Sequence, residues 1–172
     1  MTKETDHTKL AIYPGSFDPI TFGHLSLVER AAGLFDRLVV AVAASAGKEP
    51  FFDHQTRIRL VEQAIADQPY AAVVNVIGFD GLLADLAFRM KAAAIVRGLR
   101  AVSDFENEFQ MALMNRKLAR SVETVFLMPA LSWVYLSSTM VKDVAVHGGD
   151  VGELVPPTTN QEILKKFPKA KA

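Results

Sequence analysis

The chain is 172 residues long and 50% of its residues are hydrophobic, so it can bury the core of a single domain of ordinary size. Its 19 basic and 19 acidic residues cancel, which excludes an overall charge that would attract nucleic acid or a membrane surface. Because the chain has no cysteine, it has no disulfide framework, no thiolate nucleophile and no cysteine-based metal site.

The two ends of the chain indicate its organisation. The N-terminal segment MTKETDH lacks the apolar core of a signal peptide, and no later segment reaches the roughly 18 apolar residues of a membrane span. We therefore expect a cytoplasmic protein of one domain over residues 1–172, with a core over about residues 9–150 and a C-terminal helical tail over 151–172. In that tail, VPPTTN at 155–160 should break the helical pattern, and the lysine-rich residues 165–172 should be frayed and solvated.

Short apolar runs alternate with longer segments of helical period. Five runs rich in Val, Ile and Ala are predicted to be buried strands, at residues 10–13, 38–43, 72–77, 93–96 and 124–128. Helices are predicted at about residues 23–35, 53–66, 81–90 and 103–119. This order predicts an α/β fold with a Rossmann-like, doubly wound parallel sheet of five strands. Such sheets bind ligands beyond the carboxyl ends of their strands.

The first predicted strand is followed by YPGSFDPITFGH, residues 13–24, which combines glycines and prolines with hydroxyl groups and an imidazole. Gly23 and His24 fall where the next helix should begin, and a helix start offers unpaired N–H groups and a positive dipole end to a phosphate. Taken alone, the stretch is better explained as a turn with a capping role. Asp18 is a candidate metal ligand, although an Asp-Pro step is more typical of a turn.

Lysine and hydroxyl side chains follow the second and fifth predicted strands. Lys48 lies in ASAGKEP, where a single lysine is more typical of a solvated surface than of a ligand site. Ser137, Ser138 and Thr139 in WVYLSSTMVKD mark another helix start, and Lys142 lies one turn inside it. Hydroxyl groups at such a position usually cap the helix, but they can also donate hydrogen bonds to phosphates.

Two arginines follow the fourth predicted strand. Arg97 and Arg100 lie in RGLR, directly behind the apolar AAAIV, and planar guanidinium groups bind phosphate oxygens well. An ion pair with a carboxylate just downstream is an equally good explanation, and the candidates are Asp104, Glu106 and Glu108. Ser103 and Glu106 form the S-x-x-E pattern of a capping box, which predicts that the next helix starts there.

Basic or hydroxyl-bearing loops thus follow four of the five predicted strands, all at the edge of the sheet where ligands bind. Each signal alone is weak, but their conjunction favours a polyphosphate site. The sequence contains neither the Walker loop pattern nor the G-x-G-x-x-G dinucleotide fingerprint, so the phosphates must be bound in another way. The four histidines show no metal-ligand spacing, and we predict no protein-bound metal.

Three segments, YPGSFDPITFGH, RGLRAVSDFENE and LSSTMVKD, resemble the signatures of the bacterial phosphopantetheine adenylyltransferases. That family belongs to the nucleotidyltransferase superfamily, which is marked by H/T-x-G-H and I-S-S-T/S-x-x-R/K motifs. The resemblance covers about residues 10–150 in unbroken order, and GLLADLAFRM matches a further segment. It implies a fold of nucleotidyltransferase type and transfer of the adenylyl group of ATP to 4′-phosphopantetheine in coenzyme A biosynthesis. It also implies Mg²⁺ as a cofactor and a homohexamer of two trimers.

The resemblance also implies roles for matching residues. The catalytic residues would be Ser16, His24, Lys48 and Arg97. The acceptor would contact Ser16, Lys48, Leu83 and Arg97. ATP would be bound by Ser16, Phe17, His24, Gly98, Leu99, Arg100, Glu108, Trp133, Val134, Tyr135, Leu136, Ser137, Ser138 and Thr139. The chain departs from the usual pattern at Ser16, Phe22 and Lys142, where threonine, a polar residue and arginine are common.

The chemistry of this transfer requires no general base, because a phosphate monoester has a second pKa of about 6 and is largely a dianion at neutral pH. It requires in-line placement of two anions and stabilisation of the developing charge. We therefore assign His24 to hydrogen bonding in the transition state, and we expect Mg²⁺ to travel on the phosphates. Two alternatives stay open: a related transferase with another acceptor, whose members usually carry histidine in place of Thr21, and a nucleotide sensor without catalysis.

Overall fold

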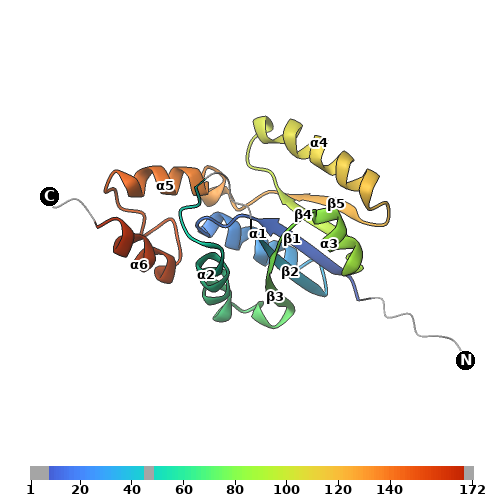
Figure 1. Ribbon diagram of the computed structural model, residues 1–172, viewed down its shortest axis with the longest axis horizontal. Coiled ribbons are helices and arrows are strands. Elements are labelled where there is room, and N and C mark those ends of the chain that lie inside the picture. Colours follow the sequence, from blue (N-terminus) through green and yellow to red (C-terminus); the bar gives the residue numbers. More distant parts are fainter. Residues whose placement is uncertain (1–7, 45–48, 169–172) are drawn as a thin grey trace, which may run out of the picture.

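The computed structural model describes residues 8–44 and 49–168, in which five parallel strands form one sheet (Figure 1). The strands are β1 (Leu10–Gly15), β2 (Arg37–Ala43), β3 (Val74–Phe79), β4 (Ala94–Gly98) and β5 (Glu123–Leu127). Their order across the sheet is β3-β2-β1-β4-β5. From β1 the chain adds β2 and β3 on one side, and it then crosses over to add β4 and β5 on the other side of β1. In sheets of this kind ligands bind in the crevice at the carboxyl ends of the two strands where the order reverses, which are β1 and β4 here.

Helices cover both faces of the sheet. They are α1 (Phe22–Ala32), α2 (His54–Ala66), α3 (Leu83–Arg89), α4 (Val102–Leu118), α5 (Ser138–Val146) and α6 (Pro157–Lys166). Successive side chains of β1 point to opposite faces. Ala11 and Tyr13 join a core cluster with α1, α2, α5 and α6, whereas Leu10 and Ile12 join a cluster with α3. The predicted doubly wound parallel sheet is confirmed. None of the described helices is long and apolar enough to cross a membrane.

The strands nearest the expected site run further than their apolar runs indicated. β1 continues through Pro14 to Gly15, and β4 continues through Arg97 to Gly98. The apolar runs in the sequence end before these proline, glycine and arginine residues, but the backbone of the same residues is still paired in the sheet. β3 starts at Val74, two residues later than predicted, because residues Ala71–Val73 form a short 3₁₀ turn.

The predicted capping box at the start of α4 is wrong. The N-cap residue is Ala101, which makes no side-chain capping hydrogen bond, and Ser103 and Glu106 lie inside the helix. The Asp104 carboxylate instead accepts a hydrogen bond from the N–H of Arg100 at 3.3 Å. This contact connects the first turn of α4 to the RGLR loop, which explains why the helix starts before the pattern predicts.

The C-terminal tail contains a helix, as expected, but two details of it differ from the prediction. VPPTTN does not break a helix but starts one, since Pro157 is the first residue of α6. Proline is favoured there because a backbone N–H at the first position of a helix has no partner within the helix. The lysine-rich end is ordered as far as it is described. Lys166 donates a hydrogen bond to the carbonyl of Phe51, and Phe167 stacks on the Phe51 ring. Residues 169–172 lie outside the described part of the chain.

Candidate functional site

A cavity of about 290 Å³ opens at the carboxyl ends of β1 and β4, where the strand order reverses. Its walls come from the loops that follow β1 and β4 and from the segment before α5. The predicted site residues that line it are Ser16, His24, Arg97, Gly98, Arg100, Glu108, Trp133, Leu136, Ser137, Ser138 and Thr139. The structure therefore brings three of the four predicted loops together. Lys48, in the fourth loop, lies outside the described residues.

Some predicted residues do not line this cavity, namely Phe17, Leu83, Leu99, Val134 and Tyr135. The Phe17 ring is 1% exposed and lies in the core, edge-on to the rings of Tyr13 and His24. A ligand could therefore meet only its backbone. Leu83 is the first residue of α3, next to a separate surface hollow that includes Leu82 and Asp85.

Gly23, expected with His24 at the helix start, also lines the cavity, whereas six lining residues were not predicted as part of the site: Tyr13, Pro14, Gly15, Thr21, Leu27 and Pro129. Most of them lie within YPGSFDPITFGH, so their position in that stretch was an available signal. Leu27 carries no chemical signal. It reaches the cavity because position 98 is glycine, where a Cβ atom would lie only 2.5 Å from Leu27 Cδ1. Burial raises the pKa of Tyr13, so its hydroxyl stays protonated.

His24 is held by the cap of α1. The N-cap residue Thr21 accepts a hydrogen bond from the His24 N–H, while the Thr21 N–H donates to His24 Nδ1 at 3.1 Å. Because Nδ1 is an acceptor here, the proton of the neutral ring is on Nε2, the nitrogen that remains for a ligand. Desolvation of the half-buried ring, and then the charge of Arg100, lower the pKa of His24 to about 4. The ring is therefore a neutral hydrogen-bond donor at neutral pH.

We expect the His24 ring to titrate at about pH 4 in an NMR titration of the folded protein, with His24→Ala used to assign its signals. A titration at or above the ordinary value of 6.5 would contradict this. The lowered pKa also makes the free energy of unfolding depend on pH. Between pH 6.5 and 4 the His24 ring binds a proton in the unfolded chain but not in the folded protein, so acid favours unfolding. This contribution to stability is complete above pH 6.5 and is lost as the pH falls toward 4.

Both arginines of the RGLR loop line the cavity and are paired. Arg97 makes a bidentate ion pair with Glu108, at 2.6 and 2.7 Å, and Arg100 pairs with Asp104 at 3.2 Å. The ion pairs with downstream carboxylates, which the sequence offered as the alternative to phosphate binding, are thus present. They do not exclude it, because a guanidinium has five N–H donors and the Glu108 pair uses only two of those of Arg97. The pair fixes the direction in which Arg97 faces the cavity.

The hydroxyl groups at the start of α5 have different roles. Ser137 is the N-cap and accepts a hydrogen bond from the N–H of Met140 at 3.1 Å, as predicted for a capping residue. Ser138 Oγ donates to the carbonyl of Pro19 at 2.8 Å, so its proton is already used and it could only accept from a ligand. Thr139 lines the same cavity one residue further on.

Asp18 anchors a turn and is not placed as a metal ligand. It is 1% exposed, and its two carboxylate oxygens accept hydrogen bonds from the N–H groups of Phe51 and Phe52, both at 2.8 Å. Lys142 Nζ lies 3.6 Å from the same carboxylate. Within residues 8–44 and 49–168 no group of three His, Asp or Glu side chains is placed to hold a metal ion.

Comparison with known proteins gives consistent matches over most of the chain. A family model described as cytidylyltransferase-like matches residues 12–144. The phosphopantetheine adenylyltransferase of Caldanaerobacter subterraneus subsp. tengcongensis is 49% identical over 162 residues, which is 94% of this chain and 99% of that protein. The protein of the same name from Legionella pneumophila (strain Paris) is 48% identical over 156 residues, 91% of each chain.

Solved structures support the fold. The nicotinic acid mononucleotide adenylyltransferase of Plasmodium falciparum, solved with NaAD, superposes with a TM-score of 0.71 and covers 93% of this chain and 96% of its own. Its sequence is only 16% identical, so this likeness concerns the fold alone.

Proposed function

Because the chain belongs to the phosphopantetheine adenylyltransferase family, we infer that it transfers the adenylyl group of ATP to 4′-phosphopantetheine, which yields dephospho-coenzyme A and pyrophosphate. The observation that carries this function is the cavity between β1 and β4. It joins two guanidinium groups, a neutral imidazole donor and helix-start hydroxyls, all of which suit phosphate oxygens.

The reaction is a displacement at the α-phosphorus of ATP. An oxygen of the acceptor phosphate forms the new P–O bond, the bond from the α-phosphorus to the bridging oxygen breaks, and pyrophosphate leaves with that electron pair. The acceptor dianion needs no deprotonation, and the lowered pKa of His24 makes the ring a donor rather than an acid. The protein therefore acts by holding the two anions in line and by stabilising charge.

We assign roles to the lining residues on these grounds. His24 Nε2–H donates to oxygens of the ATP phosphates as their charge grows. Arg97 binds the acceptor phosphate, and Arg100 binds the phosphates of ATP. Ser16, at the carboxyl end of β1, contacts the phosphate at which the bond forms. The cavity lining and the charge of these side chains support the assignments.

We propose that Mg²⁺ enters with ATP. Glu108 is engaged by Arg97 and both oxygens of Asp18 are engaged by backbone N–H groups, so neither carboxylate is left to hold the ion. The chemistry of the site fits an ion carried by phosphate oxygens and water, as magnesium often is. When bound, the ion supplies neutralisation of the charge on the leaving pyrophosphate. The cytoplasmic location stays a prediction.

A panel of acceptors tests the function. With ATP and Mg²⁺ present, 4′-phosphopantetheine should give dephospho-coenzyme A, whereas nicotinamide mononucleotide and glycerol phosphate should give no adenylylated product. Turnover of another acceptor in place of 4′-phosphopantetheine would favour the related transferase. Binding of ATP without pyrophosphate release from any acceptor would favour the nucleotide sensor.

Lys48, which the family resemblance assigns to the acceptor phosphate, gives a further prediction. The Lys48→Ala variant should raise the KM for 4′-phosphopantetheine more than the KM for ATP, because the lost charge acts on only one substrate. Lys91→Ala, outside both the cavity lining and this loop, is the matched control and should leave both constants unchanged. An equal rise in both KM values for Lys48→Ala would contradict the assignment.

We propose that the chain assembles as a homohexamer, and the surface of α4 supports this. Its only buried residue is Asn115, whereas many apolar side chains stay exposed: Val102, Phe105, Phe109, Met111, Leu113, Met114 and Leu118. The helix lies at the outside of the molecule (Figure 1), and an apolar face of this size favours an interface. α4 also carries Glu108, which orients Arg97, so assembly would brace the phosphate site.

Light scattering over a dilution series tests the assembly. We expect hexamers for the unmodified protein and dissociation for Met114→Asp, which places a charge on the exposed face of α4. Leu34→Asp, at an apolar residue outside α4 that is at least as exposed as Met114, should stay hexameric. A fully active monomer at assay concentration would contradict both the hexamer and its coupling to the site.

A further inference from the structure

The two residues just before the N-cap of α2, Phe51 and Phe52, are held by charged side chains from three other parts of the fold. Their N–H groups both donate to Asp18 in the loop after β1. The carbonyl of Phe52 accepts from Arg57 Nε at 3.1 Å, and the carbonyl of Phe51 accepts from Lys166 of α6. The N–H and carbonyl groups of both residues, which we call the Phe51–Phe52 step, are thus all bound by charged side chains.

Arg57 connects this step to the cavity. Its side chain is fully buried, and besides the carbonyl of Phe52 it binds three more. Nη1 donates to the carbonyl of Ser16 at 2.7 Å and to that of Ala43 at 2.8 Å, and Nη2 donates to that of Ala44 at 3.0 Å. A buried charge is costly unless its donors are satisfied, so this position is specialised for holding carbonyl groups.

The backbone that Arg57 holds is strained. Phe17 has φ +47°, in the left-handed region that bulky residues rarely adopt, and its buried ring contacts the His24 ring at a centroid distance of 5.2 Å. Ser16, which precedes it, lines the cavity. Strained backbone persists only where its surroundings determine it, and the Arg57 bond to the Ser16 carbonyl supplies such support.

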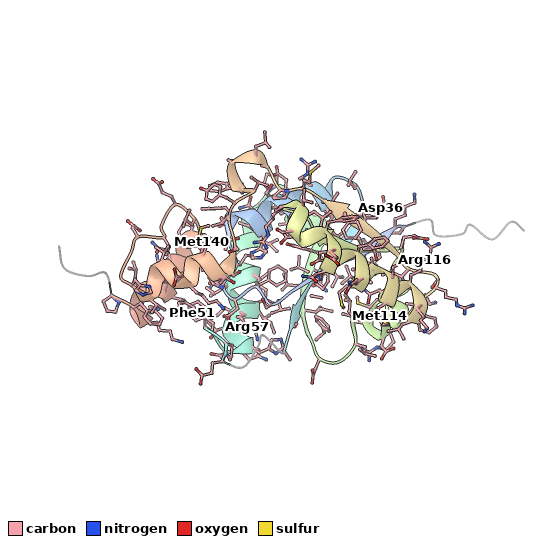
Figure 2. The ribbon with its side chains drawn as sticks, turned by 90° about the horizontal axis from the view of Figure 1, so that it is seen from above. Asp36, Phe51, Arg57, Met114, Arg116 and Met140 are labelled. Carbon is pink, nitrogen blue, oxygen red and sulfur yellow. The ribbon has the colours of Figure 1, made fainter. Side chains whose placement is uncertain are left out.

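The C-terminal end of helix α6 also contacts Phe51. Phe167 stacks on Phe51 with ring centroids 5.1 Å apart and planes at 16°, and Lys166 Nζ lies 5.2 Å above the Phe51 ring. Figure 2 shows Phe51 and Arg57 toward the same end of the molecule as Met140 of α5. The C-terminal helix therefore contacts the step that Asp18 and Arg57 fix.

We propose that Arg57 is a positioning residue for the phosphate site, and that α6 completes this support through Lys166. Arg57 holds the Ser16 carbonyl and so fixes the conformation in which Ser16 faces the reacting phosphate and the Phe17 ring packs on His24. This role rests on the proposed adenylyl transfer. It gives the C-terminal tail a function in the site although it does not line the cavity.

The main experiment compares Arg57→Lys with Arg59→Lys, the same substitution two residues on, at an exposed arginine of the same helix. A lysine cannot hold four carbonyls. We expect kcat/KM of Arg57→Lys to fall roughly tenfold or more, through kcat, with ATP affinity nearly unchanged, while Arg59→Lys keeps its activity. Amide hydrogen exchange over residues 13–24 should rise in Arg57→Lys only. Unchanged activity and exchange in folded Arg57→Lys would overturn the proposal.

A second pair keeps the proposal testable if Arg57→Lys does not fold. Lys166→Met should raise exchange over residues 13–24 and lower kcat several-fold. Lys165→Met, at a neighbouring lysine that pairs only with Glu162 among the described residues, should change neither. Equal behaviour of the two lysine variants would then overturn the proposal. If the unmodified protein forms no dephospho-coenzyme A, the proposed function fails, and the exchange comparison still decides whether Arg57 and Lys166 hold the Ser16 backbone.

Discussion

We expect His24→Ala to lower kcat by roughly a hundredfold or more and to leave the affinity for ATP within a few-fold of its original value. The reason is geometric, since Nδ1 is occupied by the Thr21 N–H and the protonated Nε2 is left for the phosphates. A donor directed at charge that develops during the reaction acts mainly in the transition state. Steady-state kinetics together with calorimetric titration of ATP would measure both quantities.

The control for this prediction is His147→Ala, which removes an exposed histidine at the C-cap of α5 and should leave kcat unchanged. His24→Ala also takes away the acceptor of the Thr21 N–H, so we expect a loss of stability of about 1 kcal/mol, which thermal unfolding would detect. A fall in ATP affinity as large as the fall in kcat would contradict a role in the transition state.

Arg97→Ala should lower kcat/KM for 4′-phosphopantetheine by roughly a hundredfold, because a charge-assisted hydrogen bond contributes about 1.5–3 kcal/mol. A second effect adds to this loss. Glu108 would lose its bidentate partner and leave an uncompensated negative charge beside the cavity that must bind two anions. The KM for ATP should change less.

Two further variants separate these effects. Arg116→Ala removes an exposed arginine of α4, labelled in Figure 2, that is not among the residues lining the cavity, and this variant should behave like the unmodified protein. Arg97→Ala combined with Glu108→Gln removes the freed charge and should recover part of the lost kcat/KM. If the double variant is no better than Arg97→Ala alone, the repulsion from Glu108 is not part of the loss.

The sheet was predictable from the sequence because its strands are short apolar runs separated by amphipathic helices. That alternation also predicted that the loops after β1 and β4 meet at one edge, where the structure has its cavity. For Arg97 and Arg100 the sequence suggested either phosphate binding or an ion pair, and the structure is compatible with both, since each arginine lines the cavity and pairs with a carboxylate of α4. Sequence spacing cannot decide between such alternatives when one side chain satisfies both.

Other features depend on contacts between distant segments. Arg57 lies in an amphipathic helix and is typical of a surface arginine by sequence, yet it is buried among carbonyls from Ser16, Ala43 and Ala44. These acceptors come together only when β1, β2 and α2 have packed. The order of the C-terminal end has the same origin, because Lys166 is fixed by Phe51, far away in the sequence. No local pattern carries this information.

The most direct measurement follows the two ends of ATP in parallel reactions with 4′-phosphopantetheine and Mg²⁺, with label at the α-phosphate in one and at the γ-phosphate in the other. We predict that the α label appears in dephospho-coenzyme A and the γ label in pyrophosphate, in equal amounts, and that His24→Ala slows both together. Label that stays in ATP, or a γ label that appears in the acceptor product, would contradict adenylyl transfer at the cavity between β1 and β4.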